Sequence, residues 1–291
     1  MKQNTRIAPS PTGYFHIGTA RTAYHNWLVA KATGGKFIVR IDDTDINRSN
    51  DSYKKIIFDC LNWLGIDYDL TFDQSDRILR YKDAANILIN KNLASISDNG
   101  AVLFNPKYIP QSWSDTVAGN IKISNMDIKA IDGMVLIKSN GLPTYNFASI
   151  VDDLDYNINR IIRGVDHISN TSKQITIACA LSDSQYIDIQ FTHVGLIHDI
   201  NGKKISKRDG AKSVTDYQDY GCDPNALLNL MLRLGWTPKL AGFDSLYKKI
   251  SKDLAISLII NQGNFKNSSS KFDLGKLNFY NKQYGGKKLL I

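Results

Sequence analysis

Apolar residues recur at helical and strand-like spacings along the first 95 residues of the chain. Between Ile17 and Ala32 the apolar side chains fall on one broad helical face, and the stretches 52–64 and 76–93 repeat that spacing. The short apolar stretch 36–41 ends in an acidic cluster and has the length and composition of a buried strand. Strands and helices that alternate in this order predict a parallel, doubly wound sheet, with ligands at the carboxyl ends of its strands.

The composition changes between residues 95 and 132. This stretch is rich in Ser, Asn, Asp and Gly, contains Pro106 and Pro110, and shows only short strand-like pieces such as 101–104. We interpret it as a short insertion between two halves of the sheet. Beyond it, the alternation resumes with expected strands at 134–138, 160–163 and 191–197 and expected helices at 145–151 and 169–181.

After Ser213 the chain shows helical patterns only. The stretches 224–236 and 272–284 are amphipathic, and residues 267–270 form a polar linker before the second of them. The expected fold class is therefore α/β, a Rossmann-like doubly wound parallel sheet with a short insertion, followed by a small helical domain. The expected units are the first half of the sheet domain (1–94), the insertion (95–132), the second half of the sheet domain (133–212) and the helical domain (213–291).

Composition and charge describe an ordinary globular protein with a basic surplus. Hydrophobic residues make up 43% and charged residues 22% of the chain, and the formal net charge of +8 is compatible with a polyanionic partner. No apolar run approaches the length of a membrane-spanning helix, and the N-terminus carries no signal-peptide pattern. Cys60, Cys179 and Cys222 stand apart without C-x-x-C spacing. We therefore expect reduced thiols, no zinc or other metal site, no membrane partner and a cytoplasmic location.

The first stretch that suggests chemistry is the turn before the helix expected at Ile17. Pro9 and Pro11 end the preceding apolar segment, since proline fixes φ and has no N–H to donate. The helix then directs its N-terminal N–H groups at whatever lies above the turn, where His16 stands and Gly18 permits close approach. This arrangement outlines a phosphate site. Taken alone, the same residues also describe an ordinary terminal histidine and a packing glycine.

A second stretch, residues 201–210, places three lysines and an arginine around one serine directly after the last expected strand of the sheet. A solvated basic loop has the same composition. Phosphoryl chemistry on ATP receives little covalent help from a protein, however, and positioned cations are what lower its energy. The second stretch closes a Rossmann-like sheet that opens with His16 and Gly18, which favours a functional role over a solvated loop.

Both stretches resemble the paired signatures of class I aminoacyl-tRNA synthetases, in the form found in the glutamyl-tRNA synthetase family. Residues 10–22 are S-P-T-G-Y-F-H-I-G-T-A-R-T, and residues 204–208 are K-I-S-K-R. Four further segments resemble motifs of that family in the right order along the chain. They are R-I-D-D-T-D at 40–45, G-L-P-T-Y-N-F-A at 141–148, I-R-G-V-D-H-I-S-N-T at 162–171 and F-D-L-G-K-L at 272–277.

The resemblance implies a glutamate–tRNA ligase, which activates glutamate with ATP and Mg²⁺ to glutamyl-adenylate and transfers the glutamyl group to the 3′ end of tRNA(Glu). The residues implied for catalysis are His16, Lys204 and Lys207. Those implied for ATP binding are His16, Gly18, Asp166, His167, Leu196, Ile197, Ile205 and Lys207. Those implied for glutamate are Arg6, Ser10, Asp42, Tyr145 and Arg163, and the one implied for tRNA is Arg48.

Physical chemistry supports these assignments in the glutamate pocket. A planar, permanently charged guanidinium binds a carboxylate through two hydrogen bonds and disfavours the neutral amide of glutamine, which suits Arg6 and Arg163. Asp42 must be ionised to pair with the substrate ammonium. In isolation, a surface arginine at a strand end would be the favoured explanation of Arg163, and a cap or loop carboxylate that of Asp42. Only the combined pattern reverses this preference.

The chain departs from the family pattern at several points. Asp42 and Val165 stand where the family has glutamates, and the segment 95–132 is shorter than the family's acceptor-binding insertion and lacks its cysteines. The sequence ends at residues 285–291, where the anticodon-binding domain would begin. We therefore expect a compact, monomeric enzyme that contacts tRNA at its acceptor end, with residues 213–291 as the stem-contact domain.

Two alternatives stay open. Glutamyl-queuosine tRNA(Asp) synthetases also lack the anticodon domain, but they usually carry a zinc-type cysteine cluster and a degenerate second signature, and this sequence has neither. A catalytically idle synthetase paralogue that serves as a binding module has no need of His16, Lys204 and Lys207, which are intact here. The sequence leaves the choice among tRNA acceptors undecided.

Overall fold

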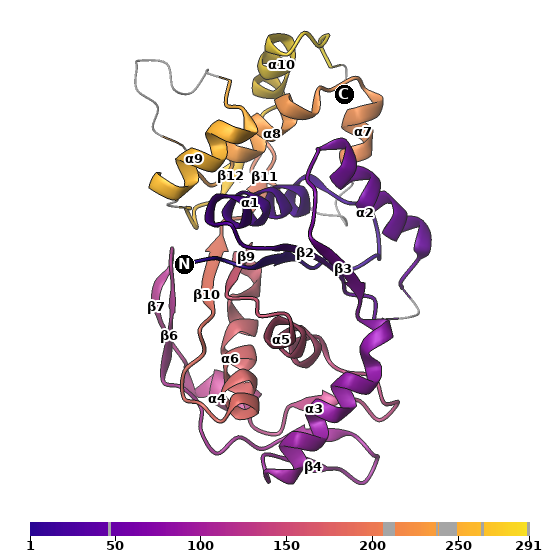
Figure 1. The fold of residues 1–291 in the computed structure, drawn as a ribbon, viewed down its shortest axis with the longest axis vertical. Helices are drawn as coiled ribbons and strands as arrows, with labels where there is room; N and C mark the ends of the chain where they lie inside the picture. Colours follow the sequence, from indigo (N-terminus) through magenta and orange to yellow (C-terminus); the bar gives the residue numbers. More distant parts are fainter. Residues whose placement is uncertain (46–47, 206–212, 237, 239–248, 263–264, 290–291) are drawn as a thin grey trace.

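The computed structural model describes residues 1–45, 48–205, 213–236, 238, 249–262 and 265–289. Its centre is a set of parallel strands contributed by two separate parts of the chain (Figure 1). The first part supplies β1 (Thr5–Ile7), β2 (Phe37–Ile41) and β3 (Leu70–Asp73), which pair in that order. The second supplies β9 (Arg160–Gly164) and β10 (Gln190–Val194).

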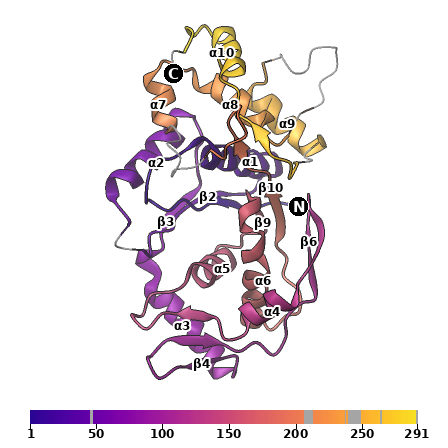
Figure 2. The same cartoon turned by 180° about the vertical axis from the view of Figure 1, so that it is seen from behind.

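The two parts adjoin at β1 and β9, which lie side by side in both views (Figures 1 and 2). Across this junction the backbone N–H of Arg160 donates to the carbonyl of Asn4 at 3.2 Å. The chain therefore runs outward from β1 to β3 on one side and from β9 to β10 on the other. Such a switch point in a doubly wound sheet leaves a crevice at the carboxyl ends of the two central strands.

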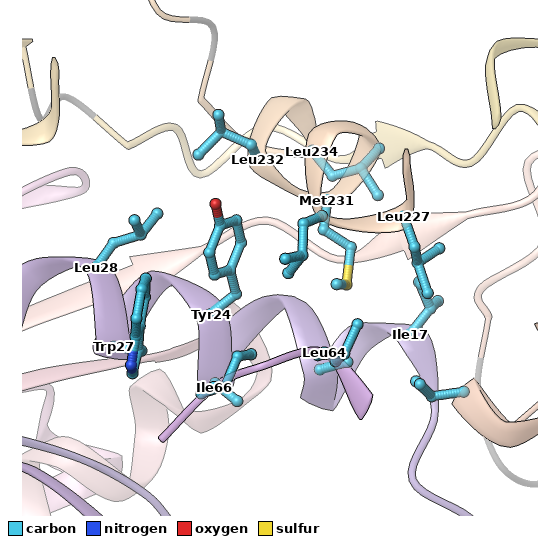
Figure 3. Packing of buried hydrophobic residues seen from close by; sticks show 14 of the residues in the cluster. Ile17, Tyr24, Trp27, Leu28, Leu64, Ile66, Leu227, Met231, Leu232 and Leu234 are labelled. Carbon is cyan, nitrogen blue, oxygen red and sulfur yellow. The ribbon is translucent and has the colours of Figure 1, made fainter. Parts of the chain in front are cut away.

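α1 (Ile17–Thr33) follows β1 and is buried on all sides over most of its length. It begins after His16, its N-cap, and ends at Gly34, whose φ of 66° is the left-handed conformation that closes many helices. The sequence pattern predicts a helix with one apolar face. The structure covers the other face as well, because α8 (Pro224–Arg233) and α9 (Lys252–Gln262) pack on α1 opposite the sheet. Figure 3 shows Tyr24 of α1 facing the apolar side chains of α8. The helix that carries the first signature is thus held from both sides.

The other face of the sheet is covered by helices that pack among themselves (Figures 1 and 2). They are α3 (Ile78–Asn90), α5 (Tyr145–Asp155) and α6 (Ile168–Ser182), with the short 3₁₀ turns η1 (Ser75–Arg77) and η2 (Val165–His167) before α3 and α6. A second apolar core forms there, separate from the core around α1. α2 (Asp51–Trp63) contributes its buried face to the core around α1.

The segment between α3 and α5 forms two small β structures and a helix. β4 (Ala94–Ile96), β5 (Val102–Phe104) and β8 (Val135–Ile137) make an antiparallel sheet. β6 (Ser112–Asp115) and β7 (Gly119–Lys122) form a hairpin, and β6 also pairs in parallel with β10. α4 (Asn125–Ile131) begins with a capping box made by Ser124 and Asp127. The insertion therefore extends the central sheet beyond β10.

Several strands differ from what the sequence pattern predicts. The strand predicted at 134–138 as part of the parallel sheet is β8, which instead pairs antiparallel with β5. An apolar run predicts a strand but carries no information about its pairing partner. β3 has no prediction at all, because it lies at an edge of the sheet and leaves Leu70 and Thr71 exposed.

The strand predicted at 191–197 is interrupted at Gly195. β10 ends at Val194, and β11 (Ile197–His198) leaves the sheet to pair with β12 (Ser270–Lys271). A Cβ at position 195 would lie 2.1 Å from the carbonyl oxygen of Ser268, so glycine is needed where the two segments pass. Hydrophobicity gives no signal of this break, because apolar residues continue on both sides of it.

The part of the chain after the second signature is mostly helical, with α7 (Val214–Asp219), α8, α9 and α10 (Leu274–Gln283). The expectation of an entirely helical segment is wrong at β12, which begins at the last residue of the expected linker. Among the described residues, no helix is both long enough and apolar enough to cross a lipid bilayer.

Candidate active site

A cavity of about 670 Å³ opens where the turn before α1 meets the end of β9. The predicted nucleotide and glutamate residues that the structure describes all line it. They are Arg6, Ser10, His16, Gly18, Asp42, Tyr145, Arg163, Asp166, His167, Leu196, Ile197, Lys204 and Ile205. Lys207 lies outside the described residues. The fold thus gathers segments that are far apart in the sequence into one pocket, at the switch point of the sheet.

His16 is fixed at the N-terminus of α1. Its Nδ1 accepts from the backbone N–H of Gly18 at 3.1 Å, and its Nε2 lies 3.2 Å from Thr19 Oγ1. A Cβ at position 18 would lie 3.0 Å from the Nδ1 and Cε1 atoms of His16, so glycine lets the imidazole fold back over the first turn. The backbone N–H of Val214 donates to the carbonyl of Phe15 at 2.9 Å, which holds the turn from the far side of the second signature. The imidazole therefore stands where a helix favours an anion.

Arg163 is a buried cation in the cavity wall, with 5% of its surface exposed. Its Nε donates to His193 Nε2 at 3.1 Å, and its Nη2 donates to Thr171 Oγ1 at 2.5 Å. Among the described residues, Nη1 has no hydrogen-bond partner. Burial lowers the pKa of Arg163 to about 10, which leaves the guanidinium charged at neutral pH. A buried, charged N–H without a partner is suited to an anion.

Arg6 and Asp42 belong to a buried network of ion pairs. Asp153 accepts from Arg6 Nε at 3.1 Å and Nη2 at 3.3 Å, and from Arg40 Nη1 at 3.0 Å. Arg40 also donates to both oxygens of Asp42, at 2.7 and 3.3 Å. Two of the three nitrogens of Arg6 are therefore engaged by the protein itself. Burial raises the pKa of Asp42 to about 6, against the lowering effect of Arg40.

His167 and Asp166, in the turn η2 after β9, add further polar side chains to the cavity wall. Tyr145 Oη lies 3.3 Å from His167 Nδ1. Burial lowers the pKa of His167 to about 4, with Arg163 as the next cause, so this imidazole is neutral at pH 7. Asp166 Oδ2 accepts from Lys204 Nζ at 3.1 Å. Burial acts to raise the pKa of Asp166, but the hydrogen bond from Lys204 holds it below the ordinary value.

Lys204 lies at the return of a tight hairpin that begins at β11. The backbone N–H of Ile205 donates to the carbonyl of Ile197 at 2.9 Å, and that of Asp199 donates to the carbonyl of Lys203 at 2.8 Å. Asp199 Oδ1 in turn accepts from the backbone N–H of Lys203 at 2.8 Å. The second signature therefore starts on a hydrogen-bonded backbone, and its remaining residues lie outside the described part of the chain.

Arg48 is separate from this cavity. Its side chain is 70% exposed and contacts Asp45, with Nη2 and Nε at 2.5 and 2.6 Å from Asp45 Oδ2. The expected contact of Arg48 with tRNA stays a prediction. Within the described ranges, no three His, Cys, Asp or Glu side chains cluster in the manner of a metal site.

Sequence reasoning misses Arg21, which lines the cavity from within α1 and is 2% exposed. Its Nη2 donates to the carbonyl of Gly195 at 2.8 Å, and its Nη1 donates to that of Leu234 at 3.3 Å. Arg21 thereby joins α1, the break after β10 and the end of α8. A charged residue among the apolar positions of a helix is a visible signal, because a buried charge needs partners.

The sequence also gives no indication of Asp153 in α5 or of His193 in β10. Each contacts an arginine that lines the cavity, and each comes from a segment that no motif covers. A histidine within an expected strand, such as His193, is the only signal that could have indicated one of them.

One family model covers most of the chain. The model of the catalytic domain of class I tRNA synthetases (E and Q) matches residues 2–100 and 103–278. The chain belongs to this family. The membership implied by the two signatures is thus confirmed, and described residues of both signatures, among them His16 and Lys204, line one cavity.

Similar proteins agree with the family. Glutamate–tRNA ligase 2 of Neorickettsia sennetsu is 44% identical over 234 residues, covering 80% of this chain and 56% of that protein. The glutamate–tRNA ligase of Nitrosospira multiformis is 35% identical over 319 aligned positions, covering 96% of this chain and 66% of that protein. This synthetase chain therefore spans 56 to 66% of the length of these two relatives.

A solved structure has the same fold. The glutamate-tRNA synthetase of Elizabethkingia anophelis superposes with a TM-score of 0.84 at 24% identity, covering 98% of this synthetase chain and 70% of that one. The predicted Rossmann-like α/β architecture is confirmed by this likeness, together with the parallel pairing of β1 with β2 and of β9 with β10.

Proposed function

We propose that this chain catalyses the two-step reaction of a glutamate–tRNA ligase. In the first step, an α-carboxylate oxygen of glutamate attacks the α-phosphorus of ATP, the bond to pyrophosphate breaks, and glutamyl-adenylate forms. In the second step, a hydroxyl at the 3′ end of tRNA(Glu) attacks the acyl carbon, and AMP leaves with the bonding electron pair. The family supports the proposal, as do the two relatives, both glutamate–tRNA ligases.

The observation that carries the proposal is the buried guanidinium of Arg163. His193 and Thr171 hold its Nε and Nη2, while Nη1 has no hydrogen-bond partner among the residues that the structure describes. A buried cationic N–H destabilises the structure unless an anion accepts a hydrogen bond from it. The γ-carboxylate of glutamate supplies that anion, whereas the amide of glutamine brings no charge.

Four further side chains suit the other groups of glutamate. Arg6 retains Nη1 for the γ-carboxylate, because Asp153 engages its other two nitrogens, and the hydroxyl of Tyr145 reaches the same cavity. Asp42 is the acceptor we assign to the α-ammonium group. Ser10, in the first signature, is the donor we assign to the α-carboxylate.

His16 and Lys204 are the groups that we assign to the phosphates of ATP. His16, at the N-terminus of α1, would donate to the α-phosphate, and Lys204 with Lys207 would neutralise charge that develops on the leaving pyrophosphate. Gly18, which makes room for the imidazole of His16 and lines the same cavity, is assigned to ATP with it. The adenosine pocket would be lined by Asp166, His167, Leu196, Ile197 and Ile205.

Mg²⁺ would enter this site with ATP and neutralise part of the phosphate charge. The described residues contain no cluster of three metal-ligating side chains, which suits an ion held mainly by phosphate oxygens and water. The side chains of the cavity would then bind and orient the triphosphate, as His16 and Lys204 are placed to do.

The tRNA partner and the domain roles are parts of the same proposal. Arg48 is assigned to the acceptor strand, residues 95–132 to the acceptor end of tRNA, and residues 213–291 to its stem. All three cysteines are buried free thiols, which supports a reducing, cytoplasmic location. We take the chain to act as a monomer.

Glutamate-dependent exchange of labelled pyrophosphate into ATP, run with and without tRNA(Glu) or tRNA(Asp), tests the proposal. Exchange and charging of tRNA(Glu) are expected. Charging of tRNA(Asp) alone would instead indicate an enzyme of the glutamyl-queuosine type. Absence of exchange with every amino acid and tRNA would indicate an idle paralogue.

Arg163→Ala tests the glutamate pocket directly. It should weaken glutamate use by about 2–5 kcal/mol, because the desolvated γ-carboxylate loses its partner. Arg160→Ala is the matched control, since Arg160 is 8% exposed in the same strand and does not line the cavity. Its KM for glutamate should stay close to that of the parent. Unchanged glutamate kinetics in Arg163→Ala, with a different amino acid as the better substrate, would show that the pocket is wrongly assigned.

A further inference from the structure

Asp115, His193 and Arg163 form a buried chain of hydrogen bonds that runs from the insertion to the cavity wall. Asp115 ends β6, and His193 lies in β10, with which β6 pairs in parallel. Asp115 Oδ2 accepts from the backbone N–H of His193 at 3.0 Å and from its Nδ1 at 2.7 Å. His193 Nε2 accepts from Arg163 Nε at 3.1 Å. Asp115 and His193 do not line the cavity, so they reach it through Arg163.

The donors and acceptors of this chain select one tautomer of His193. Arg163 can only donate, so Nε2 must be unprotonated in order to accept from it. The Asp115 carboxylate can only accept, so Nδ1 carries the proton. Burial lowers the pKa of His193, against the raising effect of Asp115 and with the help of Arg163. Burial acts to raise the pKa of Asp115, but hydrogen bonds from His193 and from two backbone amides hold it below its ordinary value. The pair is therefore a neutral imidazole on an ionised carboxylate.

His193 in turn fixes the guanidinium of Arg163. Its Nε donates to His193 and its Nη2 to Thr171 Oγ1, and its Cζ lies 5.7 Å from the centroid of the Phe191 ring. A planar group held at two nitrogens and over one face can present its third nitrogen in only one direction. That third nitrogen is Nη1, the atom without a partner in the described part of the chain.

We propose that Asp115 is a positioning residue for amino-acid selection: through the tautomer of His193, it sets how the guanidinium of Arg163, which lines the cavity, is oriented toward the substrate carboxylate. This inference rests on the proposed function. With the opposite tautomer, the N–H on His193 Nε2 would oppose the N–H on Arg163 Nε. It would also compete with Arg163 Nη2 for Thr171 Oγ1, which lies 3.1 Å from Nε2, so the guanidinium would have to move. The insertion thereby takes part in selecting the amino acid, through a residue that no substrate touches.

The competing explanation is that Asp115 only shapes the turn between β6 and β7. Its Oδ1 accepts from the backbone N–H groups of Val117 and Ala118, both at 2.8 Å. The two explanations differ in what a substitution should affect. Loss of the turn lowers stability without regard to the substrate. Loss of the tautomer raises KM for glutamate and weakens discrimination against glutamine, while KM for ATP stays the same.

Comparing Asp115→Asn in the parent with the same substitution in a His193→Gln variant separates these explanations. A glutamine side chain can offer a carbonyl oxygen to Arg163 Nε and has no tautomer to set. In pyrophosphate exchange, Asp115→Asn should raise KM for glutamate about 10- to 100-fold in the parent, the size of one hydrogen bond to a charged group. In the His193→Gln background the same change should add less than about threefold. Equal effects in the two backgrounds, or an unchanged ratio of glutamate to glutamine use in Asp115→Asn, would overturn the inference.

A spectroscopic measurement separates this inference from the proposed function. Imidazole ¹⁵N shifts of the full chain, assigned with His193→Gln, report which ring nitrogen of His193 carries the proton. We expect an unprotonated Nε2 in the parent. In Asp115→Asn the amide oxygen should stay with the N–H groups of Val117 and Ala118, so its NH2 group faces Nδ1 and the parent tautomer is lost. The same tautomer in both proteins would overturn the role of Asp115, whatever the substrate. The expected shifts in a parent that exchanges no glutamate would support the role of Asp115 and overturn the proposed function alone.

Discussion

Lys204 Nζ lies 3.1 Å from Asp166 Oδ2, and the pair joins the start of the second signature to the turn after β9. The side chains of Lys204 and Asp166 are 44% and 45% exposed. An ion pair this exposed contributes at most about 1 kcal/mol to stability. Breaking this pair therefore costs little, so under the proposed function Lys204 is available to the phosphates of ATP.

Lys204→Ala should lower the rate of glutamate-dependent pyrophosphate exchange, measured with tRNA present, by about 10²–10³, the effect of one lost charge-stabilising donor. The free energy of unfolding should change little, because the pair with Asp166 is exposed. Lys203→Ala is the matched control, since Lys203 is exposed and does not line the cavity. Equal exchange rates in the two variants would show that Lys204 takes no part in the chemistry.

Glutamate affinity should depend on pH through Asp42. Burial raises the pKa of this carboxyl to about 6, against the lowering effects of Arg40 and Arg6 and with Asp152 acting to raise it. Only the ionised form can pair with the substrate ammonium, so KM for glutamate should rise about tenfold per unit as pH falls below 6. His167 stays neutral across this window, because its pKa is about 4. KM measured between about pH 5 and 7.5 tests this expectation.

Asp42→Asn is the control for that pH profile. It should give a high KM for glutamate that no longer depends on pH near 6, because the titrating group is gone. The raised pKa also has a consequence for stability: the folded state binds this proton more tightly than the unfolded chain, whose ordinary value is 3.8. The contribution of Asp42 to stability is therefore greatest below that value and is lost as pH rises through 6. A flat KM profile in the parent would exclude Asp42 as the ammonium partner.

Much of this fold is predictable because its elements have strong local patterns. The helix at α1, the strand at β2 and the strand–helix alternation on both sides of the insertion follow from apolar spacing alone. Pairing is not local, so the pattern predicts β8 as a strand and gives it the wrong partner. The break at Gly195 depends on Ser268, more than seventy residues later, and no local signal announces it.

The cavity residues were predictable for a different reason. His16, Asp42 and Arg163 lie in motifs whose resemblance to a family carries information that their own neighbours do not. The residues that hold these side chains in place, such as Asp115 and His193, lie outside the motifs. Asp115 lies 78 residues before His193 in sequence, and only the pairing of β6 with β10 brings the two into contact. Long-range contacts between buried polar groups are what a single sequence conceals, and the folded structure is needed to reveal them.

The buried ion-pair network beside the cavity should make the stability of the fold depend on the charge of Asp153. Asp153 is 1% exposed and is shared by the guanidinium groups of Arg6 and Arg40. Burial acts to raise the pKa of Asp153, but Arg6 and Arg40 hold it below its ordinary value. A carboxylate whose pKa is lowered by folding stabilises the folded state at pH values above its ordinary pKa. That stabilisation is lost as the pH falls through the lowered pKa.

Asp153→Asn should therefore lower the free energy of unfolding at pH 7 by about 3–5 kcal/mol, because it leaves two buried arginines with too little negative charge. Asp59→Asn makes the same chemical change in the exposed pair of Lys55 and Asp59, whose side chains are 78% and 53% exposed, so it should cost no more than about 0.5 kcal/mol. Urea unfolding of the two variants and the parent measures the difference. It should shrink as the pH is lowered, since the parent then loses the charge that the substitution removes. Similar unfolding midpoints for both variants at pH 7 would mean that the buried network does not stabilise the fold, and that Arg6 is held in place by packing alone.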